Sequence, residues 1–266
     1  MSSRLSKELL PIVVAVFFVL TGSLNAAEVR LNSVIMCKSF FSGQTQMGGQ
    51  KMKLDSSFKF KAKNGQDYLL EVIRPDRLSS YLKEIAAFRI KYFREFPYLY
   101  EGNFEYEHKY INGFASDSRA LLTIVKKDTE IVGVSTALPL VSEADILGDA
   151  VKKFVEKGLN PKEYYYYGEV VIKPEHQGQG VAGALMKMQE SFAKSLGFEK
   201  IALATVVRNT SDERMPKNYV STDGVWRAAG FKKEDIYIDY EWPTILADNS
   251  IKSINNLMVF WTKDLR

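Results

Sequence analysis

The stretch that decides the fold reads Glu169-Val-Val-Ile-Lys-Pro-Glu-His-Gln-Gly-Gln-Gly-Val-Ala-Gly-Ala-Leu185. Its apolar residues 170–172 predict a strand that stops at Pro174, and a helix is expected after the turn that contains Gly178 and Gly180. Glycine carries no Cβ, so backbone N–H groups in such a turn can approach a ligand closely. The helix start adds unpaired N–H donors and the positive end of the helix dipole. Together these features predict an anion site, usually for phosphate.

The spacing Gln177-x-x-Gly180-x-Ala182 narrows this prediction. It resembles the Gln/Arg-x-x-Gly-x-Gly/Ala motif of the GCN5-related N-acetyltransferases (GNAT), which holds the pyrophosphate of acetyl-CoA in that family. The predicted helix is amphipathic over residues 181–196 and ends at a glycine. Downstream, Trp226-x-x-x-Gly230-Phe231 stands where family members usually have Tyr-x-x-x-Gly-Phe. Two motifs in the family's order make the resemblance specific.

Three other interpretations of the glycine turn are weaker. A plain strand–turn–helix junction would use the glycines for packing alone. A Walker loop is excluded because no Gly-Lys-Ser/Thr sequence follows the glycines. Residues 178–183 fit the Rossmann string Gly-x-Gly-x-x-Gly, but that fold also needs an acidic residue about 20 residues on. The next predicted strand ends in Arg208-Asn209 instead.

Strand and helix patterns follow the order of the GNAT fold from residue 67 to about residue 264. The resemblance implies an α/β (α+β) fold with a mixed central sheet of about seven strands, flanked by helices and splayed at the fourth and fifth strands. An extra helix is expected before the fourth strand. The predicted strands are residues 68–73, 120–125, 130–138, 164–172, 201–207, 236–241 and 257–262. The predicted helices are residues 78–92, 106–114, 144–157, 181–196 and a segment that ends at residue 230.

The chain divides into a hydrophobic leader (1–27), a polar linker or extension (28–66) and the GNAT domain (67–266). Residues 9–27 carry no charge and follow Arg4 and Lys7, which is typical of a signal peptide or a membrane anchor. A translation start at Met52 would make the leader spurious. Acetyl-CoA is a cytosolic metabolite, so we expect a cytoplasmic catalytic domain, with membrane association or export through residues 9–27 left open.

Composition excludes several other classes of protein. The 266 residues are 46% hydrophobic and 26% charged, which is typical of globular domains. The net charge of +4 is too small to suggest a nucleic-acid partner. The lone Cys37 allows no intrachain disulfide, and His108 and His176 lack metal-ligand spacing. No metal is therefore expected.

N-acetyl transfer needs a thioester, a neutral amine and stabilisation of an oxyanion, and positioning is the enzyme's main contribution. In the family the amine attacks the thioester directly. The resemblance assigns main-chain contacts with the cofactor to the fourth strand, and further contacts to the glycine loop, to the end of the fifth strand and to the second motif. The implied acetyl-CoA-binding residues are Val170, Val171, Ile172, Gln177, Gly178, Gln179, Gly180, Val181, Ala182, Asn209 and Trp226.

The catalytic acid and base are less clear. Glu169 is the first candidate for the base that deprotonates the amine, and Glu163 is the second; the alternative for Glu169 is a surface carboxylate. Trp226 replaces the tyrosine that serves family members as general acid. Tyr219 or Tyr237 is expected to substitute, unless the CoA thiolate leaves unaided.

The tyrosine run 164–167 places two rings on each face of a strand. Either one pair lines the acceptor site, or two rings pack in the core and two lie on the surface. The predicted function is an acetyl-CoA-dependent N-acetyltransferase acting on an amine-bearing small molecule or peptide. The alternative is a CoA-binding module with little or no turnover, possibly tethered to a membrane. We expect residues 142–167 and 209–224 to shape the acceptor pocket because specificity is carried by loops.

Overall fold

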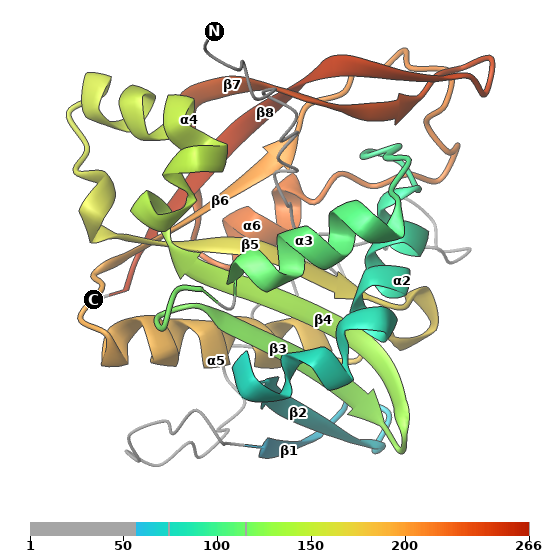
Figure 1. Ribbon diagram of the computed structural model, residues 1–266, viewed down its shortest axis with the longest axis vertical. Coiled ribbons are helices and arrows are strands. Elements are labelled where there is room, and N and C mark those ends of the chain that lie inside the picture. The colour runs from blue at the N-terminus through green and yellow to red at the C-terminus, as the bar shows by residue number, and fades with distance from the viewer. Residues whose placement is uncertain (1–56, 74, 115, 266) are drawn as a thin grey trace, which may run out of the picture.

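The computed structural model describes residues 57–73, 75–114 and 116–265. In this part of the chain eight strands form one mixed sheet in the order β1-β2-β3-β4-β5-β6-β8-β7 (Figure 1). The strands are β1 (Ser57–Lys61), β2 (Asp67–Ile73), β3 (Leu121–Lys127), β4 (Glu130–Pro139), β5 (Tyr164–Ile172), β6 (Lys200–Val206), β7 (Lys232–Ile245) and β8 (Ile251–Asp264). The α-helices are α2 (Leu82–Phe93), α3 (Phe104–Phe114), α4 (Ala144–Glu156), α5 (Val181–Ser195) and α6 (Asp223–Ala228).

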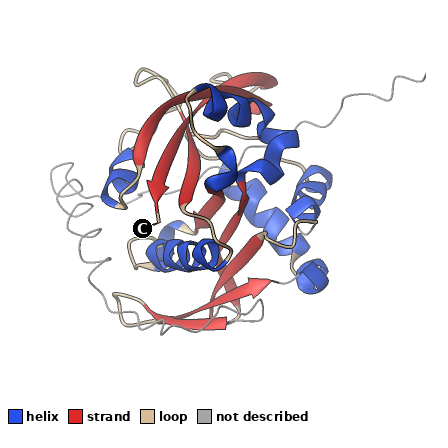
Figure 2. Cartoon of the chain, turned by 90° about the vertical axis from the view of Figure 1, so that its left-hand side faces the viewer, coloured by secondary structure: helices blue, strands red, loops and turns tan. Residues whose placement is uncertain are grey.

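Helices cover both faces of the strongly twisted sheet (Figure 2). On one face, which we call the α2 face, apolar side chains of α2, α3 and α4 form a core with the sheet. On the other, the α5 face, those of α5 and α6 form a second core. β7 contributes to the core of the α2 face alone, since every second residue from Ile236 to Thr244 is buried and those between are exposed or half-buried.

The two central parallel strands diverge along their length. Residues 164–167 of β5 pair with residues 200–203 of β6, whereas residues 169–172 pair with β4 alone. The last residues of β6 continue to pair with β8 on its other side. The register between β4 and β5 also shifts opposite Gly168, which marks a bulge where the strands separate. This is the expected splay.

Two features close the end of the fold beyond the splay. β7 and β8 form a hairpin of 14 residues per strand, longer than the sequence predicts. The connection between α2 and α3 adds to it, through a bridge between Tyr100 and Thr244 and a bond from the Ile245 N–H to the Leu99 carbonyl at 2.7 Å. The α2–α3 connection thus lies against the distal part of the hairpin.

The fold class and element order expected from the sequence are confirmed, with three corrections. The sheet has eight strands rather than about seven, because β1 lies inside the segment expected to be linker and pairs with β2. The first helix is divided into a 3₁₀ helix (Pro75–Ser80) and α2. Residues 1–56, including the predicted leader, lie outside the described residues. Among the described helices, none is long and apolar enough to cross a membrane.

Candidate functional site

The glycine turn joins β5 to α5 in the way the sequence predicts. Gly178 and Gly180 have φ angles of 72° and 104°, which residues other than glycine rarely adopt. Gly180 is the N-cap of α5, and no side chain caps the helix or places a carboxylate in its first turn. The first helical bond runs from the Ala184 N–H to the Gly180 carbonyl. The preceding N–H groups of the helix therefore have no intrahelical acceptor and are available to an anion.

Side chains and main chain brace this turn from three directions. The Gln177 side-chain amide donates to the Ile172 carbonyl at 2.9 Å, across the junction of strand and turn. The Lys63 N–H donates to the Gln179 carbonyl at 3.1 Å. His176 Nδ1 lies 2.8 Å from the Tyr68 hydroxyl on β2. The loop is thus held in shape before any ligand binds.

The free edge of β5 lies beside this turn. The Lys173 N–H donates to the Val132 carbonyl on β4, so alternation also directs the main-chain groups of Val171 towards β4. The main-chain groups of Val170 and Ile172 then face the splay, and the contact of the Ile172 carbonyl with the turn agrees with this. The expected main-chain donors of β5 are therefore reduced to Val170 and Ile172.

Glu169 belongs to a fully buried ion triad. Arg89 on α2 donates its Nε to Glu107 on α3 and its Nη1 to Glu169 on β5, and all three side chains are 0% exposed. The Arg89 guanidinium also lies over the ring of Tyr110, 4.4 Å from its centroid. The alternative of a surface carboxylate for Glu169 is wrong. The triad joins both helices to the strand that splays.

The surroundings of Glu169 raise its pKa, so this carboxyl group stays protonated up to a higher pH than an ordinary glutamate. Burial raises the pKa of Glu169 from its ordinary 4.5 to about 7; Arg89 opposes this shift and Glu107 adds to it. Two carboxylates share one guanidinium, so full ionisation would leave one uncompensated negative charge. A carboxylate with a pKa near neutrality has the acid–base property that a general base requires.

The expected acid residues lie in different places. Trp226 on α6 is 0% exposed and packs edge-on against Phe231, with 5.7 Å between ring centroids, so it offers a bound ligand no surface. Tyr237 is exposed on the face of β7 opposite the buried Ile236 and Ile238. Tyr219 packs against Phe96, and burial raises its pKa to about 12. Only Tyr219 approaches the α2–α3 connection.

The remaining predicted residues have structural partners. The Asn209 side chain accepts bonds from the Ser211 N–H and hydroxyl at 3.0 and 2.8 Å, which is a turn motif. Glu163 pairs with Lys200 at 2.8 Å near the narrow end of the splay. All four tyrosines of the run 164–167 are buried, so the expectation of two surface rings is wrong.

A family model described as "Acetyltransferase (GNAT) family" matches residues 85–217, half of the chain. The chain belongs to the GNAT family. Among solved structures, the GNAT domain of S. lividans PAT is similar to this GNAT protein with a TM-score of 0.47 and 15% identity, covering 78% of this chain and 96% of that one. The IAA acetyltransferase from Bacillus cereus ATCC 14579 has a TM-score of 0.43 and 14% identity, covering 74% and 99%.

A third structure, the ribosomal-protein-S18-alanine N-acetyltransferase from Escherichia coli, has a TM-score of 0.44 and 11% identity to this GNAT protein, covering 74% of this chain and 94% of that one. Identities this low bear on the fold alone. A search of curated protein sequences found no match. Within residues 57–73, 75–114 and 116–265, no group of three or more His, Cys, Asp or Glu residues is placed to hold a metal ion.

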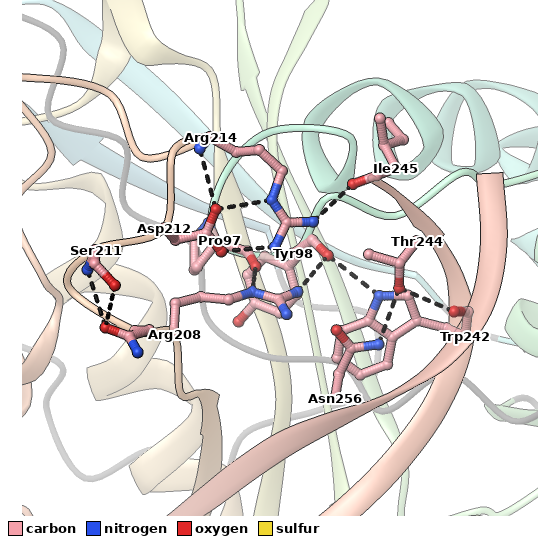
Figure 3. Close-up of polar contacts among 11 residues, drawn as sticks. Pro97, Tyr98, Arg208, Ser211, Asp212, Arg214, Trp242, Thr244, Ile245 and Asn256 are labelled. Atoms are coloured by element: carbon pink, nitrogen blue, oxygen red, sulfur yellow. Dashed lines mark hydrogen bonds and ion pairs between the residues drawn. The ribbon is translucent and has the colours of Figure 1, made fainter. Parts of the chain in front are cut away.

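Sequence reasoning missed two parts of this site in the GNAT protein. Arg89 and Glu107 lie on helices far from Glu169 in sequence. The only sign of them in the sequence is a charged residue on an otherwise apolar helix face. Arg208 lies two residues after β6, and its side chain reaches the α2–α3 connection, where it donates to the carbonyls of Pro97 and Tyr98 (Figure 3). The feature of the sequence that could have indicated Arg208 is a charged residue just after a central strand.

Proposed function

We propose that the protein is an acetyl-CoA-dependent N-acetyltransferase in which an amine attacks the thioester directly. The observation that carries this proposal is the uncapped N-terminus of α5, next to the unpaired edge of β5. The N–H groups of residues 178–182 would hold the pyrophosphate, and the main chain of Val170 and Ile172 would hold the pantetheine arm. Acetyl-CoA supplies the activated acetyl group. The acceptor is an amine-bearing small molecule or peptide.

Glu169 is the proposed base. Its pKa near 7 suits removal of a proton from an ammonium group at neutral pH. Glu169 is completely buried, so the proton reaches it through a bridging hydroxyl or water and not by direct contact with the acceptor in this conformation. Its position on the α2 face places the base opposite α5, which leaves the two substrates on different sides of the splay.

The CoA thiolate leaves without a protein acid. A thiol has an ordinary pKa of about 8.5, whereas that of Tyr219 is about 12, so proton transfer from Tyr219 to the thiolate is unfavourable. The Trp226 indole does not release a proton at neutral pH, and the side chain is fully buried. Main-chain donors on β5 are then the groups that stabilise the reaction, by binding the thioester oxygen as charge develops on it.

Thiol release tests the proposal. The full-length protein is incubated with acetyl-CoA and a panel of primary amines, polyamines, amino acids and short peptides, and free CoA is measured. We expect CoA release that depends on an amine, and an acetylated amine of matching amount by mass spectrometry. Saturable acetyl-CoA binding with no release by any amine would instead favour the binding module without turnover. Absence of both binding and release would reject the proposal.

A further inference from the structure

Arg208 lies two residues beyond the end of β6, at the end of this strand that has separated from β5. β6 ends at Val206, and the Val207 N–H still pairs with the Leu257 carbonyl on β8 at 2.8 Å. The Arg208 side chain then crosses to the α2–α3 connection, where Nε donates to the Pro97 carbonyl at 2.6 Å and Nη2 donates to the Tyr98 carbonyl at 3.0 Å (Figure 3). These bonds use the side edge of the guanidinium, so its Nη1–Nη2 end edge remains for another ligand.

The nearby carboxylate of Asp212 acts on the positive charge of Arg208 without forming an ion pair with it. Asp212, one of two acidic residues in the same loop, is bound by Arg214 instead, through Nε at 2.8 Å and Nη2 at 2.6 Å. Arg214 also donates Nη1 to the Ile245 carbonyl at 2.9 Å, which fixes it in place. Across the described residues, Arg208 forms no ion pair. Residues 207–222 carry three cations (Arg208, Arg214 and Lys217) and two carboxylates (Asp212 and Glu213), which leaves this loop with one excess positive charge.

The environment of Arg208 agrees with an uncompensated cation. Burial and, second, the like charge of Arg214 lower the pKa of Arg208 to about 10, while the charge of Asp212 opposes this shift. The loss of water is a cost that two neutral carbonyl acceptors offset only in part, since bonds between ions are stronger than bonds to neutral groups. An anion docked on the end edge would restore charge balance at this position.

Arg208 and Glu169 act on the same buried tyrosine from the two diverging strands. Burial raises the pKa of the Tyr98 hydroxyl well above its ordinary value; the charge of Arg208 lowers this pKa and that of Glu169 raises it. The proposed base and this cation therefore both lie within electrostatic range of the Tyr98 hydroxyl. In a ligand that has both an amine and an anionic group, the amine would interact with Glu169 and the anion with Arg208.

We propose that Arg208 binds a carboxylate of the acceptor, so that the acceptor is an amino acid or a peptide with its carboxylate near the reacting amine. This inference rests on the proposed acyl transfer and names its substrate class. Carboxylate suits the vacant end edge because its two oxygens match two parallel N–H donors. The remaining bonds of Arg208 to Pro97 and Tyr98 fix the orientation of the fork.

Matched acceptors test this assignment in the full-length enzyme. Each amino acid that releases CoA is compared with its carboxamide, in the wild type and in Arg208→Met, Arg208→Lys and the control Arg119→Met. Arg119 is a surface residue paired with Asp117. The ratio of acid to amide within each variant removes the intrinsic difference in amine reactivity. Ethanolamine phosphate is included to separate phosphate from carboxylate recognition.

We expect Arg208→Met to lower kcat/KM for the acids by roughly 10- to 100-fold, the range of a charged hydrogen bond, mainly through KM. The amides should change by less than about threefold. Arg208→Lys should fall between, because it keeps the charge and loses the fork, and Arg119→Met should match the wild type. Equal losses on acids and amides, or a loss on the phosphate alone, would overturn the carboxylate assignment.

A binding measurement decides the matter if no amine is acetylated. The Nε–Hε signal of Arg208 is assigned in a ¹⁵N spectrum by its loss in Arg208→Lys and followed with N-acetylglycine or N-acetylglycinamide. We expect a saturable shift with the carboxylate only. This result without turnover would keep the anion site and reject acyl transfer. Turnover with no shift from either compound, and with equal losses on acids and amides, would reject the site and keep acyl transfer.

Discussion

The two sides of the splay differ in the chemical groups that form their candidate sites. On the α5 side the candidate cofactor site consists of main-chain N–H groups shaped by Gly178 and Gly180, and it has no capping side chain. On the α2 side the candidate acceptor site consists of charged side chains from separate elements, with Glu169 buried against Arg89 and Glu107. Main-chain sites depend on local backbone shape, whereas side-chain sites depend on distant parts of the chain coming together. The two sides should therefore respond differently to substitution.

The largest effect is expected for the buried triad. Arg89→Met leaves two carboxylates in the interior without their cation, which typically costs about 3–5 kcal/mol of unfolding free energy. Urea denaturation at pH 7 measures the loss. Adding Glu107→Leu to Arg89→Met should restore part of the stability, because one unpaired carboxylate is then removed.

The matched control is Lys152→Met on α4, which removes an exposed ion pair with Asp149. A surface pair contributes only about 0–1 kcal/mol. A loss in Arg89→Met no larger than in this control would show that the triad is not the main support of the α2 side.

The second effect is the pH dependence carried by Glu169. Its folded pKa of about 7 exceeds the ordinary 4.5, so the folded protein binds more protons than the unfolded chain between these values. Stability from this group is therefore lost as pH rises, by about 2 kcal/mol from pH 5 to pH 7. Glu169→Gln should flatten this part of the stability profile. An unchanged slope in that variant would refute the assignment of the raised pKa.

The activity of the wild type should follow the opposite trend. A base must be deprotonated to act, so kcat/KM is expected to rise with pH and level off above about 7. Glu169→Gln should lose this rise together with most of the activity. A variant that keeps both would show that Glu169 is a structural carboxylate only.

The third effect concerns the α5 side. Gly180→Val places a β-branched residue at a φ of 104°, which such residues essentially never adopt, and it distorts the helix start. We expect acetyl-CoA to bind at least about tenfold more weakly, which corresponds to 1.4 kcal/mol. Gly224→Ala on α6 is the control, since its added Cβ meets no atom within 4 Å and its φ is not positive. Equal affinity in both variants would count against the loop as the cofactor site.

The contrast between the two sides also explains what the sequence could predict. Gln177, Gly178 and Gly180 lie within four residues, so their spacing alone predicts the turn, the helix start and the anion site. The resemblance to the GNAT family implies the splay as well. The α2 side was largely hidden, because residues 89, 107 and 169 are brought together only by the packing of α2 and α3 on β5. Sequence could propose Glu169 as a base but could not show that two other charges surround it.

The smallest effect is expected where the family motif and this chain differ. Trp226→Tyr restores the tyrosine of the family motif, but the site is completely buried and packed against Phe231. We expect kcat to change by less than about twofold, while the smaller ring lowers stability by about 1–3 kcal/mol. Stopped-flow or steady-state thiol release measures kcat. A clear gain in kcat would mean that this position does reach the leaving thiolate.

Calorimetric titration of acetyl-CoA into the full-length wild type, Gly180→Val and Arg208→Met tests the central division most directly. We predict one site per chain in the wild type, binding at least about tenfold weaker in Gly180→Val, and an affinity within about twofold of wild type in Arg208→Met. Absence of binding to the folded wild type, or equal affinity in wild type and Gly180→Val, would contradict a main-chain cofactor site on the α5 side.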